Sequence, residues 1–188
     1  MSSDSENVEP TLENYREYLQ LLAQLNLDKQ LQGKIDLSGV VQQTMLEAYQ
    51  ALPRYQKQGT DQLAAWLRQI LANNLADEVR KLRTGKRDVR REKSLDAALQ
   101  HSSVRLQEWL ANEQSSPSGR IQRQEQAVSL TAALAKLPDA QRDALVLRHF
   151  QGHSLAEIAA QLGRSHAAVA GLLKRGLQQL RNQLDDWK

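Results

Sequence analysis

Residues 154–175 read SLAEIAAQLGRSHAAVAGLLKR and hold the strongest local signal in the chain. Ser154 followed three residues later by Glu157 is the pattern of a capping box, which starts a helix. Gly163 suits the left-handed residue that ends a helix, and Ser165 suits the N-cap of the next one. The stretch therefore predicts two short helices joined by a tight turn.

The spacing within these two helices is typical of a helix-turn-helix. Ala159 lets the helices cross closely, Gly163 makes the turn and Val169 fills the crossing. With Val169 and Leu172 facing inward, the rest of the second helix is free to enter a major groove. A plain helical hairpin is the alternative that this spacing leaves open. The candidate DNA-contacting residues are Arg164, Ser165, His166, Ala167, Ala170, Gly171, Lys174 and Arg175.

Apolar residues recur in steps of three and four along most of the remaining chain, which is the period of an amphipathic helix. No segment alternates as a strand does, and 9 Gly and 4 Pro in 188 residues are few for a turn-rich β-sandwich. The fold class expected is therefore all-α. Helices are expected over residues 11–27, 37–52 (closed by Pro53), 61–79, 122–137 and 137–150.

The modest net charge of +3 conceals one strongly basic segment. Residues 80–93 hold 8 basic and 2 acidic side chains, whereas residues 1–79 hold 6 basic and 11 acidic ones. A basic block of this kind is the footprint of a polyanion site, because each neutralised phosphate releases counterions. A solvated basic face is the simpler alternative.

The middle of the chain changes character. Residues 94–110 have weak helical periodicity with few large apolar anchors, and residues 112–119 (NEQSSPSG) have turn and linker composition. We expect two small helical domains, residues 11–93 and 125–188, joined by a linker over 94–124 that lets each domain find its own site. Residues 1–10 are expected to be disordered.

Several function classes find no support in the sequence. The absence of Cys excludes disulfides, thiolate zinc sites and a cysteine nucleophile. The four histidines form no H-E-x-x-H motif, and Gly152 separates His149 from His153. Neither a phosphate-binding loop nor a G-x-S-x-G motif occurs, no apolar run approaches the roughly 20 residues of a membrane span, and residues 1–10 are too polar for a signal peptide. We expect a cytoplasmic protein with no catalytic residues, metal or cofactor.

Two separated blocks resemble the sigma-70 family of bacterial RNA polymerase specificity subunits, in particular its extracytoplasmic-function type. Residues 36–49 (DLSGVVQQTMLEAY) and 64–80 (AAWLRQILANNLADEVR) are similar to region 2 of that family, and residues 137–181 are similar to its region 4. The resemblance implies a region-2-like helical bundle and a region-4-like helix-turn-helix. It also implies two partners, core RNA polymerase and promoter DNA, and leaves an anti-sigma factor open as a third.

The resemblance assigns roles to two groups of residues in the first block and one in the second. Residues 36–52 match the helix that docks on the polymerase clamp, and the segment from Asn74 matches the face that meets the minus-ten element. The helix-turn-helix matches the reader of the minus-thirty-five element. The implied polymerase-binding residues are Asp36, Val40, Gln42, Gln43, Leu46 and Glu47, and the implied minus-ten residues are Asn74, Asp77, Arg80, Lys81, Arg83, Lys86, Arg87 and Arg90.

Some positions depart from the family pattern. The family usually has an acidic residue where Gly39 stands and a glutamate where Gln43 stands, which weakens charge pairing with a basic clamp surface. The recognition helix has Ala168 and Ala170 where threonine and longer polar residues are common in the family. We therefore expect recognition of the promoter to depend more on DNA shape and less on direct base contacts. The basic block contains no aromatic residue on which a base could stack.

Two further readings compete with a sigma factor. One is a helix-turn-helix transcriptional regulator whose N-terminal half is a sensor or dimerisation domain. The other is a purely helical interaction protein. The first block and its basic extension favour the sigma factor, because a sensor domain would need neither.

Overall fold

The computed structural model of the protein describes residues 12–27, 29–55, 63–83, 89–113 and 120–185. These residues form helices and turns without a strand, so the all-α prediction is confirmed. None of the described helices is both long and apolar enough to cross a bilayer. In chain order the elements are the 3-10 turn η1 (Leu12–Tyr15), α1 (Arg16–Asn26), α2 (Lys29–Gln32), α3 (Leu37–Tyr55), α4 (Leu63–Arg83), α5 (Val89–Glu113), α6 (Arg120–Ala135), α7 (Asp139–Leu145), the π-helical segment η3 (Val146–Phe150), α8 (Leu155–Leu162) and α9 (His166–Asp185).

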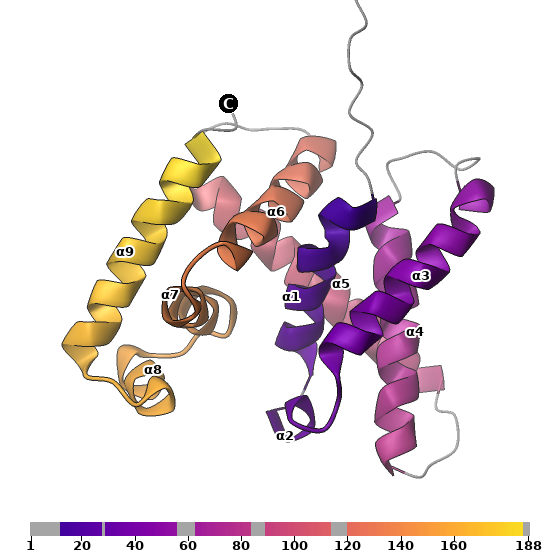
Figure 1. The fold of residues 1–188 in the computed structure, drawn as a ribbon, viewed down its shortest axis with the longest axis horizontal. Helices are drawn as coiled ribbons and strands as arrows, with labels where there is room; N and C mark the ends of the chain where they lie inside the picture. Colours follow the sequence, from indigo (N-terminus) through magenta and orange to yellow (C-terminus); the bar gives the residue numbers. More distant parts are fainter. Residues whose placement is uncertain (1–11, 28, 56–62, 84–88, 114–119, 186–188) are drawn as a thin grey trace, which may run out of the picture.

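The helices form three groups side by side. Figure 1 shows α3 and α4 on one side of the molecule and α7, α8 and α9 on the other, with α1, α5 and α6 between them. The middle group contacts both outer groups, because α1 packs on α3 and α6, and α6 packs on α9. The middle group therefore joins the N-terminal and C-terminal halves of the chain.

The N-terminal half is held by an apolar core between α1, α3 and α4. Leu19 and Leu22 of α1 and Leu71 of α4 are fully buried, and Met45 of α3 is 2% exposed. These residues repeat at helical spacing in the sequence, as the periodicity predicted. Full burial of each side chain contributes about 1.5–3 kcal/mol relative to exposure.

Helix α3 extends beyond its predicted end. Pro53 was expected to close the helix, but it lies inside α3, which continues to Tyr55. A proline removes one backbone donor and disfavours a helix interior. Here the last turn is held by its side chains, since Tyr55 is buried and stacks on Trp66 of α4 with ring centroids 4.4 Å apart.

The helix-turn-helix follows its local signals closely. The backbone N–H of Ser154 donates to Glu157 Oε2 at 2.7 Å, and the Ser154 hydroxyl accepts from the Glu157 N–H at 3.3 Å, so the capping box is confirmed. Gly163 has a φ of 61°, in the left-handed region where glycine is favoured. Ser165 Oγ accepts from the N–H of Ala168 at 3.2 Å and begins α9.

The linker prediction is wrong for residues 94–113. These residues belong to α5, which packs on α4, α1 and α6. Leu99 and Leu106 are fully buried in the same core as the N-terminal helices. Residues 114–119, towards the C-terminal end of the predicted linker, lie outside the described residues, as do residues 1–10.

Polar contacts explain why the burial of α5 could not be predicted from its hydrophobic pattern. The hydroxyl of Tyr18 in α1 donates to Oγ of Ser103 at 2.7 Å, and Arg68 of α4 donates to the Tyr18 oxygen at 2.8 Å. Asn26 Nδ2 donates to Ser102 Oγ at 3.0 Å. Serines that look solvent-facing in the sequence therefore sit against partners from α1 and α4, where paired polar groups are tolerated.

We expect Tyr15 to make the folded chain sensitive to alkali. Tyr15 is 5% exposed, and burial, with the nearby Glu125 carboxylate as a smaller cause, raises the pKa of its phenol to about 12. The neutral phenol is thus favoured in the folded state, and this stability is present below pH 10 and lost as the pH rises from about 10 to about 12. Urea unfolding between pH 9 and 11.5 should show a decline that Tyr15→Phe reduces by up to about 2 kcal/mol. An equally steep decline in the variant would contradict this assignment.

Candidate polymerase and promoter interfaces

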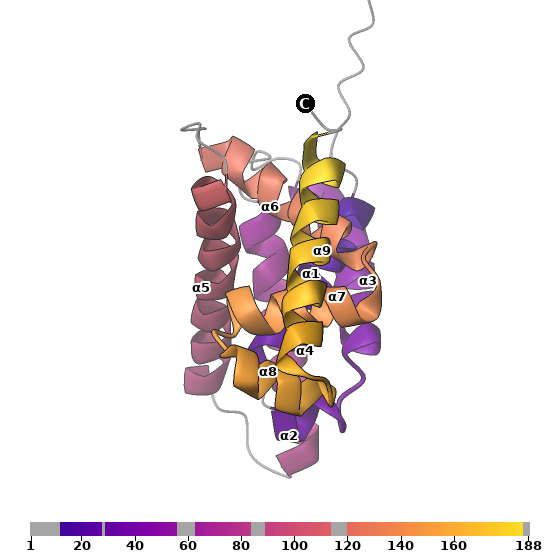
Figure 2. The same ribbon diagram turned by 90° about the vertical axis from the view of Figure 1, so that its left-hand side faces the viewer.

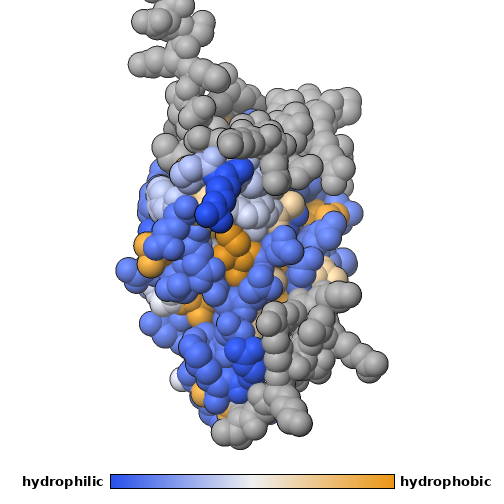
Figure 3. Space-filling view, turned by 90° about the vertical axis from the view of Figure 1, so that its right-hand side faces the viewer, coloured by the Kyte–Doolittle hydropathy of each residue, from blue (hydrophilic) through white to orange (hydrophobic). Residues whose placement is uncertain are grey.

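Helix α3 carries an exposed apolar pair. Leu46 is 51% and Tyr49 48% exposed, although both fall on the apolar stripe that predicts burial. They lie one helical turn apart beside the exposed Gln42. Figure 3, which views the side of the molecule where α3 and α4 lie, shows a mainly hydrophilic surface with isolated hydrophobic patches. An exposed apolar pair on a helix suits a protein partner. Tyr49 is not among the predicted docking residues, because its spacing in the sequence predicts burial in the core.

Val40 is mostly buried. It was among the implied polymerase-binding residues, but it is only 5% exposed and lies in the core between α3 and its neighbours. A side chain already packed against its own chain offers little surface to a partner. Val40 instead packs α3 against the core. The other five residues, Asp36, Gln42, Gln43, Leu46 and Glu47, are exposed or half-buried.

The two departures at the start of α3 have local causes. Asp36 Oδ1 accepts from the N–H of Gly39 at 3.0 Å, which is an N-terminal cap. A Cβ at position 39 would lie 2.6 Å from Asp36 Oδ2, so a side chain there would displace the cap. Gln43 Nε2 donates to Glu47 Oε1 at 2.8 Å, whereas a glutamate at position 43 would repel Glu47.

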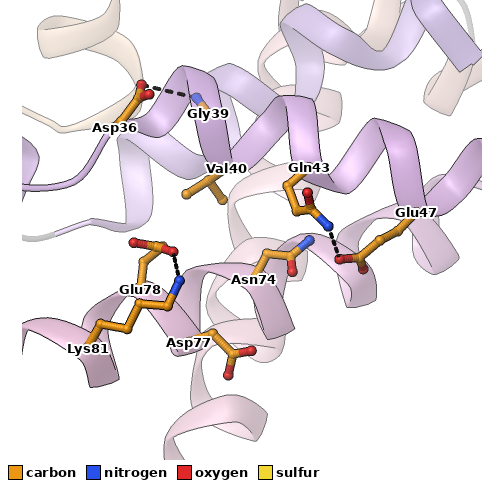
Figure 4. A pocket seen from close by; sticks show the side chains of 9 residues that line it. All are labelled: Asp36, Gly39, Val40, Gln43, Glu47, Asn74, Asp77, Glu78 and Lys81. Carbon is orange, nitrogen blue, oxygen red and sulfur yellow. Dashed lines mark hydrogen bonds and ion pairs between the residues drawn. The ribbon is translucent and has the colours of Figure 1, made fainter.

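A hollow of about 490 Å³ lies between α3 and α4. Figure 4 shows the side chains of both helices around it, among them the carboxylates of Asp36, Glu47, Asp77 and Glu78. Asn74 Nδ2 donates to Thr44 Oγ1 at 3.1 Å and so ties the two helices together. Because carboxylates outnumber the one lysine of its lining, Lys81, the hollow repels phosphates and suits a neutral polar or cationic group.

Two basic residues near the end of α4 form ion pairs with carboxylates of the same helix. Arg80 lies 2.9 Å from Asp77, and Lys81 lies 2.6 Å from Glu78, each pair spanning three residues on the helix. Surface pairs of this kind contribute about 0–1 kcal/mol, so a phosphate can replace the carboxylate at little cost. Lys86 and Arg87 lie outside the described residues, and the same holds for the side chains of Arg83 and Arg90.

The recognition helix presents the face that the sequence predicted. Val169 is fully buried and Leu172 is 8% exposed, in a small core shared with Ile158 and Ala159. Figure 2 shows α9 across the front of the molecule, with α8 beside its N-terminal part. Gly171 is half-buried, and the Arg175 guanidinium lies close to it. The exposed candidates are Arg164, Ser165, His166, Ala167, Ala170, Lys174 and Arg175.

The two histidines that lie four residues apart have different neighbours. His149 packs against the ring of Trp109, with centroids 5.5 Å apart, and His153 Nδ1 lies 4.0 Å from Glu157 Oε2. No group of three metal-ligating side chains occurs within the part of the chain that the structure describes.

Comparison with known proteins covers both halves of the chain. Residues 14–84 match the family model Sigma-70 region 2, and residues 127–180 match Sigma-70, region 4. The chain is also similar to the sigma factor RpoE from Bartonella quintana, solved in complex with the anti-sigma factor NepR, at 19% identity and a TM-score of 0.34 over 93% of this chain and 94% of that one. No curated protein matches the chain.

The two matched regions stand in the family's order and together cover most of the chain. The region 2 match identifies the N-terminal half as a sigma factor region. A regulator with an N-terminal sensor domain would not contain this region. The chain therefore belongs to the sigma-70 family of RNA polymerase sigma factors.

Proposed function

We propose that three surfaces divide the work of this sigma factor. The exposed face of α3 docks on core RNA polymerase, the C-terminal part of α4 meets the minus-ten element, and the start of α9 reads the minus-thirty-five element. The presence of region 2 and region 4 in order on one chain carries this proposal. The exposure of Leu46 and Lys174 and the half-buried position of Arg80 support it.

Docking depends on apolar contact more than on charge. Leu46 and Tyr49 offer an apolar pair, and the neighbouring Gln42 and Gln43 are neutral amides that cost little to desolvate beside a partner. The glutamine that replaces a usual glutamate at position 43 removes one charge from this face. We therefore extend the proposed docking surface to Asp36, Gln42, Gln43, Leu46, Glu47 and Tyr49.

Promoter contact at α4 combines attraction with exclusion. Arg80 and Lys81 attract phosphates once their ion pairs with Asp77 and Glu78 are broken. The acidic hollow next to them repels the same phosphates, so a DNA strand is held along the end of α4 and kept out of the space between α3 and α4. In this proposal the strand follows the end of α4.

The chain itself performs no chemistry in this proposal. The polymerase supplies catalysis, and the sigma factor supplies binding and position, in the cytoplasm where the polymerase works. The N-terminal module extends to the end of α5 at Glu113, because Leu99 and Leu106 of that helix lie in its core. The C-terminal module begins with α6 and holds the helix-turn-helix.

Replacing Lys174 by alanine is expected to weaken binding to a promoter fragment about fivefold at 0.1 M salt and to lower the salt slope by about one. Lys174 is exposed on α9 beside the candidate base-reading positions, so its ammonium can neutralise one phosphate. The effect should be similar on fragments of different sequence, because phosphates carry no sequence information. Fluorescence anisotropy at several salt concentrations measures both quantities.

Lys136→Ala is the matched control for Lys174. Lys136 is also an exposed lysine of the C-terminal module, but it lies between α6 and α7 and outside the helix-turn-helix. We expect its variant to bind as the parent chain does. Equal losses in both variants would show that general charge governs binding, and the proposed face of α9 would then be wrong.

A further inference from the structure

The first half of α9 contains a run of residues whose side chains carry no polar atom. Residues 167–173 read AAVAGLL, and we call them the apolar run. Val169 and Leu172 belong to the small core of the helix-turn-helix. Ala167 and Ala170 are exposed, so their methyl groups are open to a partner. For almost two turns of the recognition helix, the outward side chains therefore cannot form hydrogen bonds.

Polar side chains precede the apolar run, but one of them is already engaged. Ser165 Oγ accepts from the N–H of Ala168 at 3.2 Å, so this hydroxyl oxygen serves the N-terminal cap. Arg164 and His166 are exposed at the same end of α9. They can serve bases or phosphates at that end only, because the run that follows extends about 10 Å along the helix axis.

Positive charge borders the apolar run on its C-terminal side. The Arg175 guanidinium leans back along the helix, and its Nη1 lies 3.1 Å from the place that a Cβ on Gly171 would take. It leaves Ala170 exposed. Residues 158–184 hold four arginines and lysines and no carboxylate side chain. The surface around the run therefore attracts a polyanion, although the run itself carries no charge.

Methyl groups can recognise one feature of the base edges in a major groove. Thymine carries a C5-methyl group there, and alanine is one of the side chains that make apolar contact with it. The β-carbons of residues three apart on a helix are about 5–6 Å from each other. That distance corresponds to one or two base-pair steps of about 3.4 Å. The spacing of Ala167 and Ala170 therefore matches two thymines that are adjacent or separated by one base pair.

We propose that Ala167 and Ala170 contact thymine methyl groups in the minus-thirty-five element and so select thymine at two positions within three consecutive base pairs. This inference rests on the proposed reading of that element by α9. Arg164, Lys174 and Arg175 hold the DNA backbone at the two ends of the apolar run. The small outward side chains let the α9 backbone come close to the base edges. Each contact removes two methyl groups from water, so selection needs no hydrogen bond.

Promoter selection by the complex of the full chain with core polymerase shows whether thymines are chosen. The minus-thirty-five element is randomised, and the promoters that the complex retains are sequenced. We expect thymine to be enriched at two positions within three consecutive base pairs. Enrichment of a sequence without such thymines would overturn this inference and leave the proposed sigma factor function intact. Absence of any enrichment would instead contradict the reading of this element by α9, so the two failures are distinguishable.

Replacing each selected thymine by uracil tests the methyl group itself, because uracil keeps the base pair and lacks only the C5-methyl. We expect the complex to bind about threefold more weakly for one replacement and about tenfold more weakly for both, since burial of one methyl group contributes a factor of about three to four. At the same positions, 5-methylcytosine should be bound about threefold more tightly than cytosine. Equal binding of the thymine and uracil promoters would overturn the proposal and assign the selection to DNA shape.

Ala170→Gly identifies the methyl group on the protein side. Because glycine also lowers helix stability, the quantity to compare is the ratio of the affinities for the thymine and uracil promoters, not the affinity itself. We expect this ratio to fall from about three to about one at one of the two positions and to stay unchanged at the other. Ala167→Gly should have the same effect at the other position. Ala160→Gly, which removes an exposed methyl group on α8, is the matched control and should keep both ratios. Parental ratios in all three variants would contradict the roles of Ala167 and Ala170.

Discussion

Replacing Leu46 by glutamate is expected to lower the affinity of the chain for core polymerase by about 30-fold or more. Leu46 is half-exposed at the centre of the proposed docking surface, next to Tyr49. A buried apolar anchor at an interface contributes about 2 kcal/mol or more, and an added charge must also be desolvated on binding. Because the side chain is exposed in the free chain, folding should be little affected. Titration of labelled chain with core polymerase measures the change.

Val104→Glu is the matched control for Leu46→Glu. Val104 is 42% exposed on α5, so the substitution places the same charge on an equally accessible apolar position away from α3. Its affinity for polymerase should equal that of the parent chain, and both variants should keep the parent's helicity. A similar loss in both variants would indicate general charge repulsion and would remove the evidence for a docking surface on α3.

Replacing Leu106 by alanine is expected to destabilise the chain by about 2–5 kcal/mol, and Leu99→Ala by a similar amount. Both leucines are fully buried between α5 and the N-terminal helices. Each substitution leaves a cavity in a core that is close-packed. Urea unfolding followed by circular dichroism measures the free energy of unfolding. Val104→Ala, on the exposed side of the same helix, should change it by no more than about 0.5 kcal/mol.

These variants separate a packed helix from a flexible connector. If residues 94–113 served only as a tether, neither leucine would contribute to the core, and both alanine variants would unfold at the same urea concentration as the parent. That result would contradict the position of α5 in the N-terminal module. It would also remove the surface against which Trp109 holds η3.

The helix-turn-helix was predictable because the residues that determine it act on near neighbours in the sequence. Ser154, Glu157, Gly163 and Ser165 act within three or four residues of their partners, and the structure places all four as the sequence indicated. The inward position of Val169 follows from the same short-range frame. Capping chemistry of this kind needs no information about the rest of the chain.

The α3 surface could be predicted only in part. Eight apolar residues between positions 40 and 52 mark an amphipathic helix, but a stripe this wide does not say which members face the core. Val40 turned out to be buried, whereas Leu46 and Tyr49 are exposed. The neighbours that decide this are α1 and α4, which are distant in the sequence.

Helix α5 had no clear local signal in the sequence. Residues 94–110 have few large apolar side chains, and their burial depends on hydrogen bonds to Tyr18 and Asn26, which lie more than 75 positions away. Trp109 could be core, linker anchor or interface on sequence grounds, and its contacts with η3 decide among them. Pairings of this range are set by tertiary packing, so a weak pattern was read as a linker.

Transcription from a promoter library by core polymerase, with and without the chain, tests the central claim most directly. We expect the chain to co-purify with core polymerase and to produce discrete run-off transcripts from a subset of promoters on which core polymerase alone initiates at background level. Leu46→Glu should abolish most of this gain, and Val104→Glu should retain it. If the chain fails to associate with core polymerase and the transcripts match those of the core enzyme alone, the sigma factor account is contradicted.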